Sequence, residues 1–435
     1  MARAMKGGRV DGRFVLWVCV AFVLGIVVSL LVANLGASEK KIERTLERLH
    51  DTHDPAFARD LSLLLGPPLL EGNLAEVLVN GDRIFKAMLE DIRGAKSTIS
   101  FETYIYWGGT IGEEFAVALA ERARAGVKVH VLLDWVGSAR LDKASLDRMK
   151  EAGVEIERYH EPHWSKLPRL NNRTHRKVLV VDGKVGFTGG VGIADKWRGD
   201  AQDAEHWRDT HFRVRGPVVA QMQSVFNDNW TKATGRVLHG RVYFPPVEPL
   251  PGGMPAQMFS SSPSGGAESM HLMYLLAITA SKRSIELSNS YFVPDDLTIK
   301  ALAAAARRGV KVRIIVPGPI IDSDVVRAAS RADWEPLLEA GVQIAEYQPT
   351  MFHCKVLVVD GRFVSVGSTN FDNRSFRIND EANLNLLDDK FAAEQVKVFE
   401  HDLSRSKVVT LEAWRNRPKK ERALEWFGQL LKSQL

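Results

Sequence analysis

Residues 174–183 of the chain read Thr-His-Arg-Lys-Val-Leu-Val-Val-Asp-Gly, and residues 353–361 read His-Cys-Lys-Val-Leu-Val-Val-Asp-Gly. In both stretches the apolar run predicts a buried strand, and the histidine and lysine share one face of it because they stand two residues apart. Asp-Gly predicts a turn, followed by a return strand that ends at a glycine. Four residues therefore recur with identical spacing: His175, Lys177, Asp182 and Gly189 as His353, Lys355, Asp360 and Gly367.

The sequence upstream of the two stretches repeats as well. Residues 125–133 match residues 308–316, and each segment follows an alanine-rich helical run, at 115–125 and at 299–308. A β-rich run precedes each helix (97–106 and 284–292), and an Ala-Gly-Val segment follows in each half (152–156 and 340–344). Strands that alternate with helices in this way predict a layered α/β unit, made twice. Duplication further predicts a pseudo-twofold arrangement that brings the equivalent residues to one cleft.

The N-terminal region predicts a membrane segment. Residues 14–35 contain no charged residue and follow Arg3, Lys6, Arg9 and Arg13. At about 1.5 Å per residue this run spans a bilayer core of ~30 Å. A cleaved signal peptide is the alternative, but its apolar core is shorter, roughly 7–15 residues. We therefore expect a retained anchor, with its basic flank in the cytoplasm and the body of the protein outside it.

These patterns divide the chain into seven segments. They are a basic cytoplasmic tail (1–13), a transmembrane anchor (14–35), a juxtamembrane segment (36–75), a first domain (76–245), a linker rich in Pro, Gly and Ser (246–266), a second domain (267–415) and a basic amphipathic tail (416–435). The charged stretch 40–65 predicts a helix that Gly66-Pro67-Pro68 ends. The apolar residues of the C-terminal tail have helical spacing, which suits either packing against the body or a membrane interface.

Composition excludes several classes of protein. Hydrophobic residues make up 45% and charged residues 26% of the chain, which is typical of a globular protein. A net charge of +5 suits anionic partners, phospholipid or nucleic acid, without choosing between them. The two cysteines, Cys19 and Cys354, cannot form a disulfide framework, and no Cys or His pair has a zinc-like spacing together with a matching second pair. We expect no metal and no other cofactor.

The duplicated residues suit the chemistry of a phosphodiester. Lysine supplies a fixed positive charge to phosphoryl oxygens, and Ser368 and Asn370, after the second return strand, offer hydrogen bonds to the same atoms. A histidine attacks phosphorus or protonates a leaving alkoxide. With two histidines, one serves as nucleophile and the other as acid and then base. Asp182 and Asp360 either take part in this chemistry or structure the turns in which they stand.

The motifs resemble those of the phospholipase D superfamily, most closely the bacterial cardiolipin synthases, over roughly residues 70–415. The matching stretches are Glu102-Thr-Tyr-Ile-Tyr106, Leu133-Asp-Trp-Val-Gly-Ser138, Gly189-Gly-Val-Gly-Ile-Ala-Asp195, Trp207-Arg-Asp-Thr-His-Phe-Arg-Val-Arg-Gly-Pro217, Tyr291-Phe-Val-Pro-Asp295 and Gly367-Ser-Thr-Asn-Phe-Asp-Asn-Arg-Ser-Phe376. The resemblance implies an α/β fold in which two pseudo-twofold-related phospholipase D-like units share one active site, behind an N-terminal transmembrane helix. It also implies a metal-independent reaction through a phosphohistidine.

The resemblance implies further roles. In that superfamily an acidic residue downstream of its motif orients each catalytic histidine; Asp209 and Glu381 are the candidates here, with Asp380 as an alternative to Glu381. The nucleophile implied is His175, although the sequence by itself does not separate it from His353. Gly192 stands where the family commonly has asparagine, so one side-chain phosphate donor is missing, and a backbone N–H takes its place in this interpretation.

The activity implied is that of a cardiolipin synthase, which transfers a phosphatidyl group from one phosphatidylglycerol to another and releases glycerol. A hydrolytic phospholipase D or a nuclease of the same fold is one alternative, and a catalytically inactive, membrane-tethered lipid-binding module is another. The complete His-Lys pairs argue against the inactive form. The expected partners are anionic phospholipid and the membrane, with no nucleic acid.

Overall fold

The structure is a computed structural model that describes residues 12–36, 42–161, 171–263, 268–432 and 434. Helix α1 (Gly12–Gly36) belongs to an N-terminal unit of its own and contains the predicted span 14–35. Its window Gly12–Ser29 has a mean hydropathy of 2.2, so α1 is long and apolar enough to cross a membrane. The predicted basic tail lies mostly outside the described residues.

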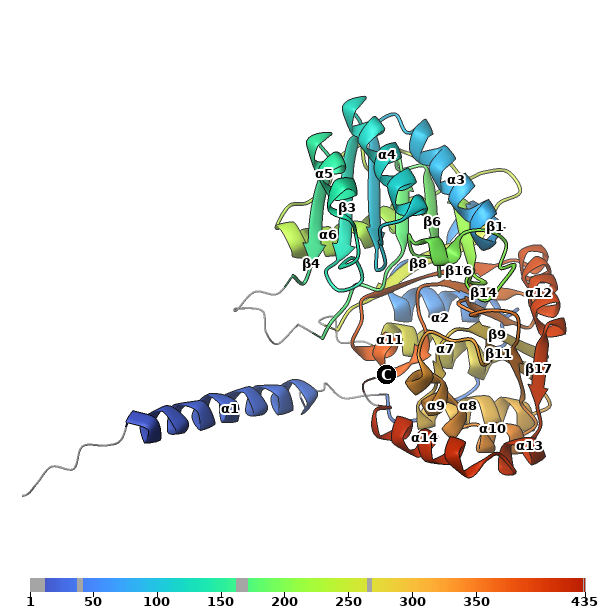
Figure 1. Ribbon diagram of the computed structural model, residues 1–435. Helices are drawn as coiled ribbons and strands as arrows, with labels where there is room; N and C mark the ends of the chain where they lie inside the picture. The colour runs from blue at the N-terminus through green and yellow to red at the C-terminus, as the bar shows by residue number, and fades with distance from the viewer. Residues whose placement is uncertain (1–11, 37–41, 162–170, 264–267, 433, 435) are drawn as a thin grey trace, which may run out of the picture. The chain divides into compact units, whose positions relative to one another are not determined.

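The described residues from Ile42 onward, apart from Asn171, form a second unit, built around a fifteen-stranded sheet of order β17-β12-β11-β9-β13-β14-β16-β8-β1-β7-β6-β5-β2-β3-β4 (Figure 1). The strands of the first half are β1 (Leu70–Val79), β2 (Thr98–Thr103), β3 (Lys128–Asp134), β4 (Glu155–Tyr159), β5 (Val178–Val181), β6 (Val185–Gly189) and β7 (Thr210–Arg215). Those of the second half are β8 (Met254–Ser261), β9 (Ser284–Asn289), β11 (Lys311–Pro317), β12 (Gln343–Tyr347), β13 (Lys355–Val359), β14 (Phe363–Gly367), β16 (Glu381–Leu387) and β17 (Ser406–Val409). A separate parallel pair joins β10 (Phe292–Val293) to β15 (Phe371–Asp372).

The strand order confirms the duplication predicted from the sequence. Outward from the central β1–β8 pair, each strand has a counterpart in the other half: β7 and β16, β6 and β14, β5 and β13, β2 and β9, β3 and β11, β4 and β12. Strands β2, β3 and β4 are parallel, as are β9, β11 and β12, and the strands nearer the centre are antiparallel. Only β17, on the outer edge of the second half, lacks a counterpart among the strands of this sheet.

Helices cover both faces of the sheet, so strands such as β2, β5, β14 and β16 are buried along their whole length. The helices of the first half are α3 (Asn80–Gly94), α4 (Thr110–Arg124), α5 (Lys143–Glu151), the short helix η2 (Asp195–Trp197) and α6 (Val219–Thr234). Those of the second half are α7 (Ser269–Ala280), α8 (Asp296–Arg307), α9 (Asp324–Ala332), α10 (Glu335–Glu339), α11 (Asn373–Arg377), α12 (Asp389–Ser404), α13 (Leu411–Arg415) and α14 (Lys419–Leu430).

One apolar cluster joins the two halves. It combines side chains of α6 and β7, such as Met222 and Phe212, with side chains of β14 and α12, such as Val364 and Phe391. Burying a side chain of this kind stabilises a fold by about 1.5–3 kcal/mol. The shared cluster therefore fixes one half against the other, and with them the residues at the junction.

The predicted linker, 246–266, is not a simple connection. It contains β8, which pairs with β16 on one side and with β1 on the other, and thus occupies the centre of the sheet. Ala256 and Met258 alternate along β8 and enter the shared apolar cluster. The Pro- and Gly-rich residues that flank this strand drew the prediction toward a loop.

The helix predicted over 40–65 is shorter than expected, since within the described part of that stretch only α2 (Pro55–Leu65) is helical. Asp54 caps the helix by accepting a hydrogen bond from the Ala56 N–H, and a residue before proline is disfavoured in helical conformation. Helix α2 buries Phe57 and Leu61 in the core of the second half. Residues 42–75 of the predicted juxtamembrane segment therefore belong to the folded body, and β1 begins ahead of the predicted boundary at residue 76.

Candidate active site

The two His-Lys motifs lie at the junction of the halves, where β5 and β13 begin. The backbone N–H of His175 donates to the carbonyl of Asp380, and that of His353 donates to the carbonyl of Arg208. Each motif is therefore hydrogen-bonded to the segment that leads into β16 or β7 of the opposite half. Both histidines and both lysines are at least 92% buried: His175 is 8% exposed, His353 7%, Lys177 4% and Lys355 2%.

The histidine–carboxylate pairs are crossed between the halves. Nδ1 of His175 lies 2.9 Å from Oε1 of Glu381, and Nδ1 of His353 lies 2.8 Å from Oδ2 of Asp209. The resemblance pointed to these two carboxylates but placed each with the motif of its own half. That pairing is wrong, because the backbone bonds described above deliver the residue after Asp380 and the residue after Arg208 to the opposite imidazole.

These contacts fix the tautomer of both imidazoles. Burial alone would raise the pKa of Glu381 and of Asp209, but the partner histidine and the neighbouring lysine lower both pKa values on balance. An ionised carboxylate only accepts, so Nδ1 of each ring carries the proton and donates it. Nε2 of each histidine therefore carries a lone pair that can attack phosphorus or accept a proton, as in other His-carboxylate pairs.

Burial favours the neutral form of both imidazoles in the free protein. Burial, and then the charge of Lys177, lower the pKa of His175 to about 4, and burial with the charge of Lys355 lowers that of His353. Burial and the charge of Lys355 also lower the pKa of Lys177 to about 7. Because Lys355, from the second half, acts on both His175 and Lys177, the two motifs form one site.

The two lysines have different neighbours. Nζ of Lys355 donates to the Ser290 hydroxyl (2.6 Å), which donates to Oδ1 of Asn370 (2.8 Å). In the first half, the strand register puts Tyr104 in the place of Ser290. Nζ of Lys177 lies 5.7 Å from the centre of that ring and donates to the carbonyl of its neighbour His175. One cation is thus held by a polar chain and the other faces an aromatic ring.

Packing explains why the chain has Gly192 in the position of Asn370. A Cβ on Gly192 would lie 2.7 Å from Cβ of Ile105, the residue after Tyr104. An asparagine therefore does not fit unless Ile105 moves. The asymmetry inferred from the sequence therefore accompanies the close approach of Ile105 to Gly192.

The imidazoles also differ in their surroundings. The rings of Trp197 and Trp207 pack against His353 at centroid distances of 5.3 and 5.6 Å. Trp197 donates its indole N–H to Asp209, which fixes the carboxylate as well. His175 packs edge-on against Tyr104, at 5.3 Å. His353 therefore has the more apolar enclosure.

Ser368 has a different partner from the one predicted. The sequence predicted that Ser368 donates to the phosphate. In the structure its side chain is fully buried and donates to Oε2 of Glu381. Glu381 thus accepts from Ser368 and His175 together, and Ser368 positions the carboxylate. Asn370 lies nearer the predicted role, since it contacts Lys355 through Ser290.

Asp182 and Asp360 lie away from the two histidines. Seven residues of extended chain, about 20 Å, separate each aspartate from the histidine of its motif. Asp182 accepts from the backbone N–H groups of Lys96, Ser97 and Thr98, and Asp360 accepts from those of Lys282, Arg283 and Ser284. Both residues have a positive φ in the turn that follows the strand. They fasten the strand turns, which was the alternative left open by the sequence, and do not join the catalytic set.

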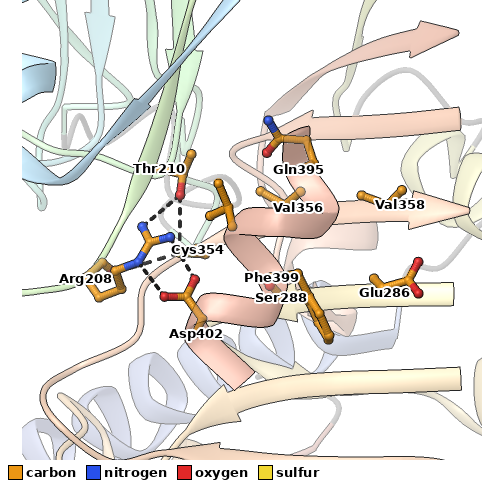
Figure 2. A pocket seen from close by; sticks show the side chains of 11 residues that line it. Arg208, Thr210, Glu286, Ser288, Cys354, Val356, Val358, Gln395, Phe399 and Asp402 are labelled. Atoms are coloured by element: carbon orange, nitrogen blue, oxygen red, sulfur yellow. Dashed lines mark hydrogen bonds and ion pairs between the residues drawn. The ribbon is translucent and has the colours of Figure 1, made fainter. Parts of the chain in front are cut away.

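Buried arginine–aspartate ion pairs lie on the opposite face of each motif strand. Arg208 donates two hydrogen bonds to Asp402 of α12 (2.9 and 2.7 Å) and one to Thr210, beside a cavity of about 10 Å³ under Cys354 (Figure 2). A cavity of that size has room for about one water. Arg176 contacts Asp228 and Asp380 in the corresponding place of the first motif. Both arginines hold the backbone next to Asp209 and Glu381.

Sequence reasoning missed four residues of the site: Tyr104, Ser290, Trp197 and Trp207. Tyr104 and Trp207 stand in stretches that carried the resemblance, but no role was attached to them. Ser290 had a weaker signal, as the residue before Tyr291. Register alone identifies Ser290 as the counterpart of Tyr104, and register is visible only in the folded sheet.

The site has the parts for nucleophilic transfer of a phosphoryl group: two Nε2 atoms, two cations and two fixed carboxylates. Within the described residues, no group of His, Cys, Asp and Glu side chains has the arrangement of a metal site. Lys177 and Lys355 are the buried cations of the two motifs and lie beside the imidazoles.

Comparison with known proteins gives the family. Residues 88–230 and 274–403 match the family model described as "Cardiolipin synthase, PLD-like domain", in two parts that correspond to the two halves. A cardiolipin synthase of Geobacillus kaustophilus is 36% identical over 84% of this chain and 73% of its own length. Cardiolipin synthase 1 of Bacillus cereus is 32% identical over 95% of this chain and 87% of its own length.

Among solved structures, the phosphatidylserine synthase of Haemophilus influenzae covers 87% of this chain and 100% of its own, with a TM-score of 0.67 and 16% sequence identity, which supports the fold. The family match, the long curated alignments and the paired His-Lys motifs agree. The chain belongs to the cardiolipin synthase family of phospholipase D-like enzymes.

Proposed function

We propose that the protein transfers a phosphatidyl group from one phosphatidylglycerol to a head-group hydroxyl of another, releasing glycerol and forming cardiolipin. The relatives named above carry the name of that activity. The observation that carries the proposal is the crossed pairing of two histidines with two buried carboxylates around two lysines. This arrangement supplies a nucleophile and a separate proton carrier in one place.

In the first step, Nε2 of His175 attacks the phosphorus and the bond to the glycerol oxygen breaks. His353 donates its Nε2 proton to that oxygen, so glycerol leaves as a neutral alcohol. The phosphodiester brings a negative charge next to both imidazoles, which raises the pKa of His353 from its lowered value and allows it to carry this proton. Lys177 and Lys355 balance the charge on the phosphoryl oxygens.

In the second step, Nε2 of His353 takes the proton from the hydroxyl of the second phosphatidylglycerol. The resulting alkoxide attacks the phosphorus, and the bond from phosphorus to His175 breaks. Glu381 and Asp209 hold the proton of each Nδ1 throughout. Ser290 and Asn370 keep Lys355 aimed at the phosphate, and Tyr104 takes the corresponding place beside Lys177.

The test is the pair His175→Ala and His353→Ala. Residues of one catalytic unit are strongly non-additive, so each variant should lose nearly all activity and the double variant should be little worse. His353→Ala should still accumulate a phosphatidyl adduct on His175 when the leaving group needs no proton, and mass spectrometry of quenched protein measures it. An adduct on His353 reverses the two roles, and a fully active His175→Ala enzyme refutes the mechanism.

The acceptor is tested by product analysis. Purified protein supplied with phosphatidylglycerol alone should yield cardiolipin and glycerol. Phosphatidic acid in place of cardiolipin would identify water as the acceptor and make the protein a hydrolytic phospholipase D. Neither product would support the inactive lipid-binding alternative.

We further propose that α1 remains attached as a single-pass anchor, with the basic residues before it in the cytoplasm and the body on the outer side of the membrane. The length and composition of α1 and the four basic residues ahead of the uncharged run 14–35 support this orientation. Protease added to intact cells should cleave the body, and protease added to inverted vesicles should not. A mature N-terminus near Ser38 would refute the anchor.

A further inference from the structure

Helix α14 (Lys419–Leu430) is amphipathic, and its polar side faces the protein. Glu425 is buried between Arg417 and Arg331, at 2.6 and 3.5 Å. Gly428 touches α9 so closely that a Cβ would lie 2.7 Å from the Ala329 nitrogen. Gln429 donates to Asp333 on the same side. Figure 1 shows α14 alongside α9, on the outside of the second half.

The apolar side of α14 faces outward. Between 38% and 65% of each large apolar side chain is exposed at Leu424, Trp426, Phe427, Leu430 and Leu431. Residues three, four and seven apart share a helix face, so these side chains form one contiguous surface. We call this surface the α14 face. An apolar patch of this kind on an otherwise polar surface marks an interaction site.

The charge of the helix indicates what binds there. Lys419, Lys420 and Arg422 are exposed in its first turn, and Lys420 shares the face of Leu424 and Phe427. A lysine within an apolar contact between two proteins loses its water, whereas at a bilayer it reaches up to the lipid phosphates. A basic helix with aromatic and leucine residues on one face is typical of a helix that lies in a membrane interface.

Hydrogen bonds connect the end of α14 to the start of the folded body. The carbonyl of Lys432, just after α14, accepts from Asn373. Asn373 accepts from Arg377, which also donates to Glu268, and Glu268 accepts from the backbone N–H of Ile42. Five residues of sequence, 37–41, precede Ile42 and follow α1. The start of the described body, Ile42, is therefore connected to the end of α14 by this series of hydrogen bonds.

We propose that the α14 face lies in the interfacial layer of an anionic phospholipid bilayer, with its basic residues at the lipid phosphates. The inference rests on the proposed membrane attachment through α1 and is independent of the catalytic roles. A second contact with the bilayer would hold the body at the lipid surface.

Collisional quenching in proteoliposomes tests the position of this face. The full-length chain carries Cys19→Ser, so that Cys354 is the remaining cysteine. Cys354 is buried, and burial raises the pKa of its thiol to about 12, so it resists labelling. An environment-sensitive dye is attached at Phe427→Cys, or at the matched control Gln429→Cys on the other side of the same helix. The vesicles contain equal parts of phosphatidylglycerol and phosphatidylcholine, with nitroxide-labelled lipid as the quencher.

We expect the dye at position 427 to shift to the blue and to be quenched by shallow nitroxides, and the dye at position 429 to do neither. Equal signals at the two positions would overturn the proposal. So would efficient disulfide cross-linking between copies through Phe427→Cys, which would make the α14 face a contact between two chains. The same quenching in a His175→Ala background separates this result from any failure of the proposed chemistry.

A kinetic comparison gives a second readout. The variant Phe427→Ser/Leu430→Ser should turn over bilayer phosphatidylglycerol several-fold more slowly, while its rate with a dispersed short-chain phosphatidylglycerol stays that of the unmodified chain. An equal loss of rate with both substrates would mean that the α14 face supports the fold. No loss of rate with either substrate would mean that the α14 face does not contact the bilayer.

Discussion

The crossed histidine–carboxylate pairs predict that the two carboxylates have different kinetic roles. Glu381 serves the histidine of the first half and Asp209 serves that of the second. Glu381→Gln should therefore impair attack on phosphorus, whereas Asp209→Asn should impair proton transfer to the leaving oxygen. If each histidine were instead paired with the carboxylate of its own half, the two kinetic roles would be exchanged.

The magnitude follows from the geometry. Each carboxylate is fully buried and holds the Nδ1 proton at 2.8–2.9 Å, so an amide in its place can donate to Nδ1 and select the tautomer that has its proton on Nε2. In other enzymes, holding a catalytic histidine in the wrong tautomer, or removing a general acid or base, reduces kcat by about 10²–10⁴-fold. That range corresponds to about 3–5 kcal/mol of transition-state stabilisation.

The assay compares phosphatidylglycerol with a phosphatidyl ester of an acidic phenol, whose oxygen leaves without a proton. With the second substrate, Asp209→Asn should regain most of its single-turnover rate of phenol release, while Glu381→Gln should remain slow with both. Asp228→Asn, a change from carboxylate to amide in the partner of Arg176 outside the reacting pairs, is the matched control and should stay within a few-fold of the unmodified enzyme. Rescue of Glu381→Gln and not of Asp209→Asn would refute the crossed assignment.

Three further predictions concern the remaining groups of the site. Burial and the charge of Lys355 lower the pKa of Lys177 to about 7, so kcat/KM should fall as the pH rises through that value and Lys177 loses its charge. Lys177→Arg should shift this alkaline limit upward because a guanidinium stays charged, and an unchanged pH profile would contradict the reasoning. Asp182→Ala leaves three backbone donors without their acceptor and should lower the free energy of unfolding by about 2–3 kcal/mol, measured by urea denaturation, while the activity of the folded fraction persists. Activity should survive excess chelator, since the lysines provide the charge; complete loss that magnesium or calcium restores would disprove this.

Local patterns in the sequence were sufficient for the elements of the fold. Alternation along 174–183 and 353–361 placed histidine and lysine on one face, and the repeat of helices and strands gave two equivalent α/β units, as the strand order confirms. These features depend on residues close together in the chain. The exceptions were β8, whose Pro- and Gly-rich flanks suggested a linker, and the stretch before Pro55, where a cap interrupts a helical composition.

The sequence by itself thus determined the duplicated unit, the apolar N-terminal helix and the two His-Lys pairs, and the family resemblance offered Asp209 and Glu381 as candidate carboxylates, with Asp380 as an alternative. Only the tertiary structure decided which carboxylate contacts which histidine, that Tyr104 and Ser290 occupy equivalent positions, and that the apolar side of α14 faces outward. The physical reason is the range of the contacts. Periodicity fixes the direction of a side chain within its own strand or helix, whereas partners across the junction are set by the backbone bonds and the shared apolar cluster that hold the two halves together.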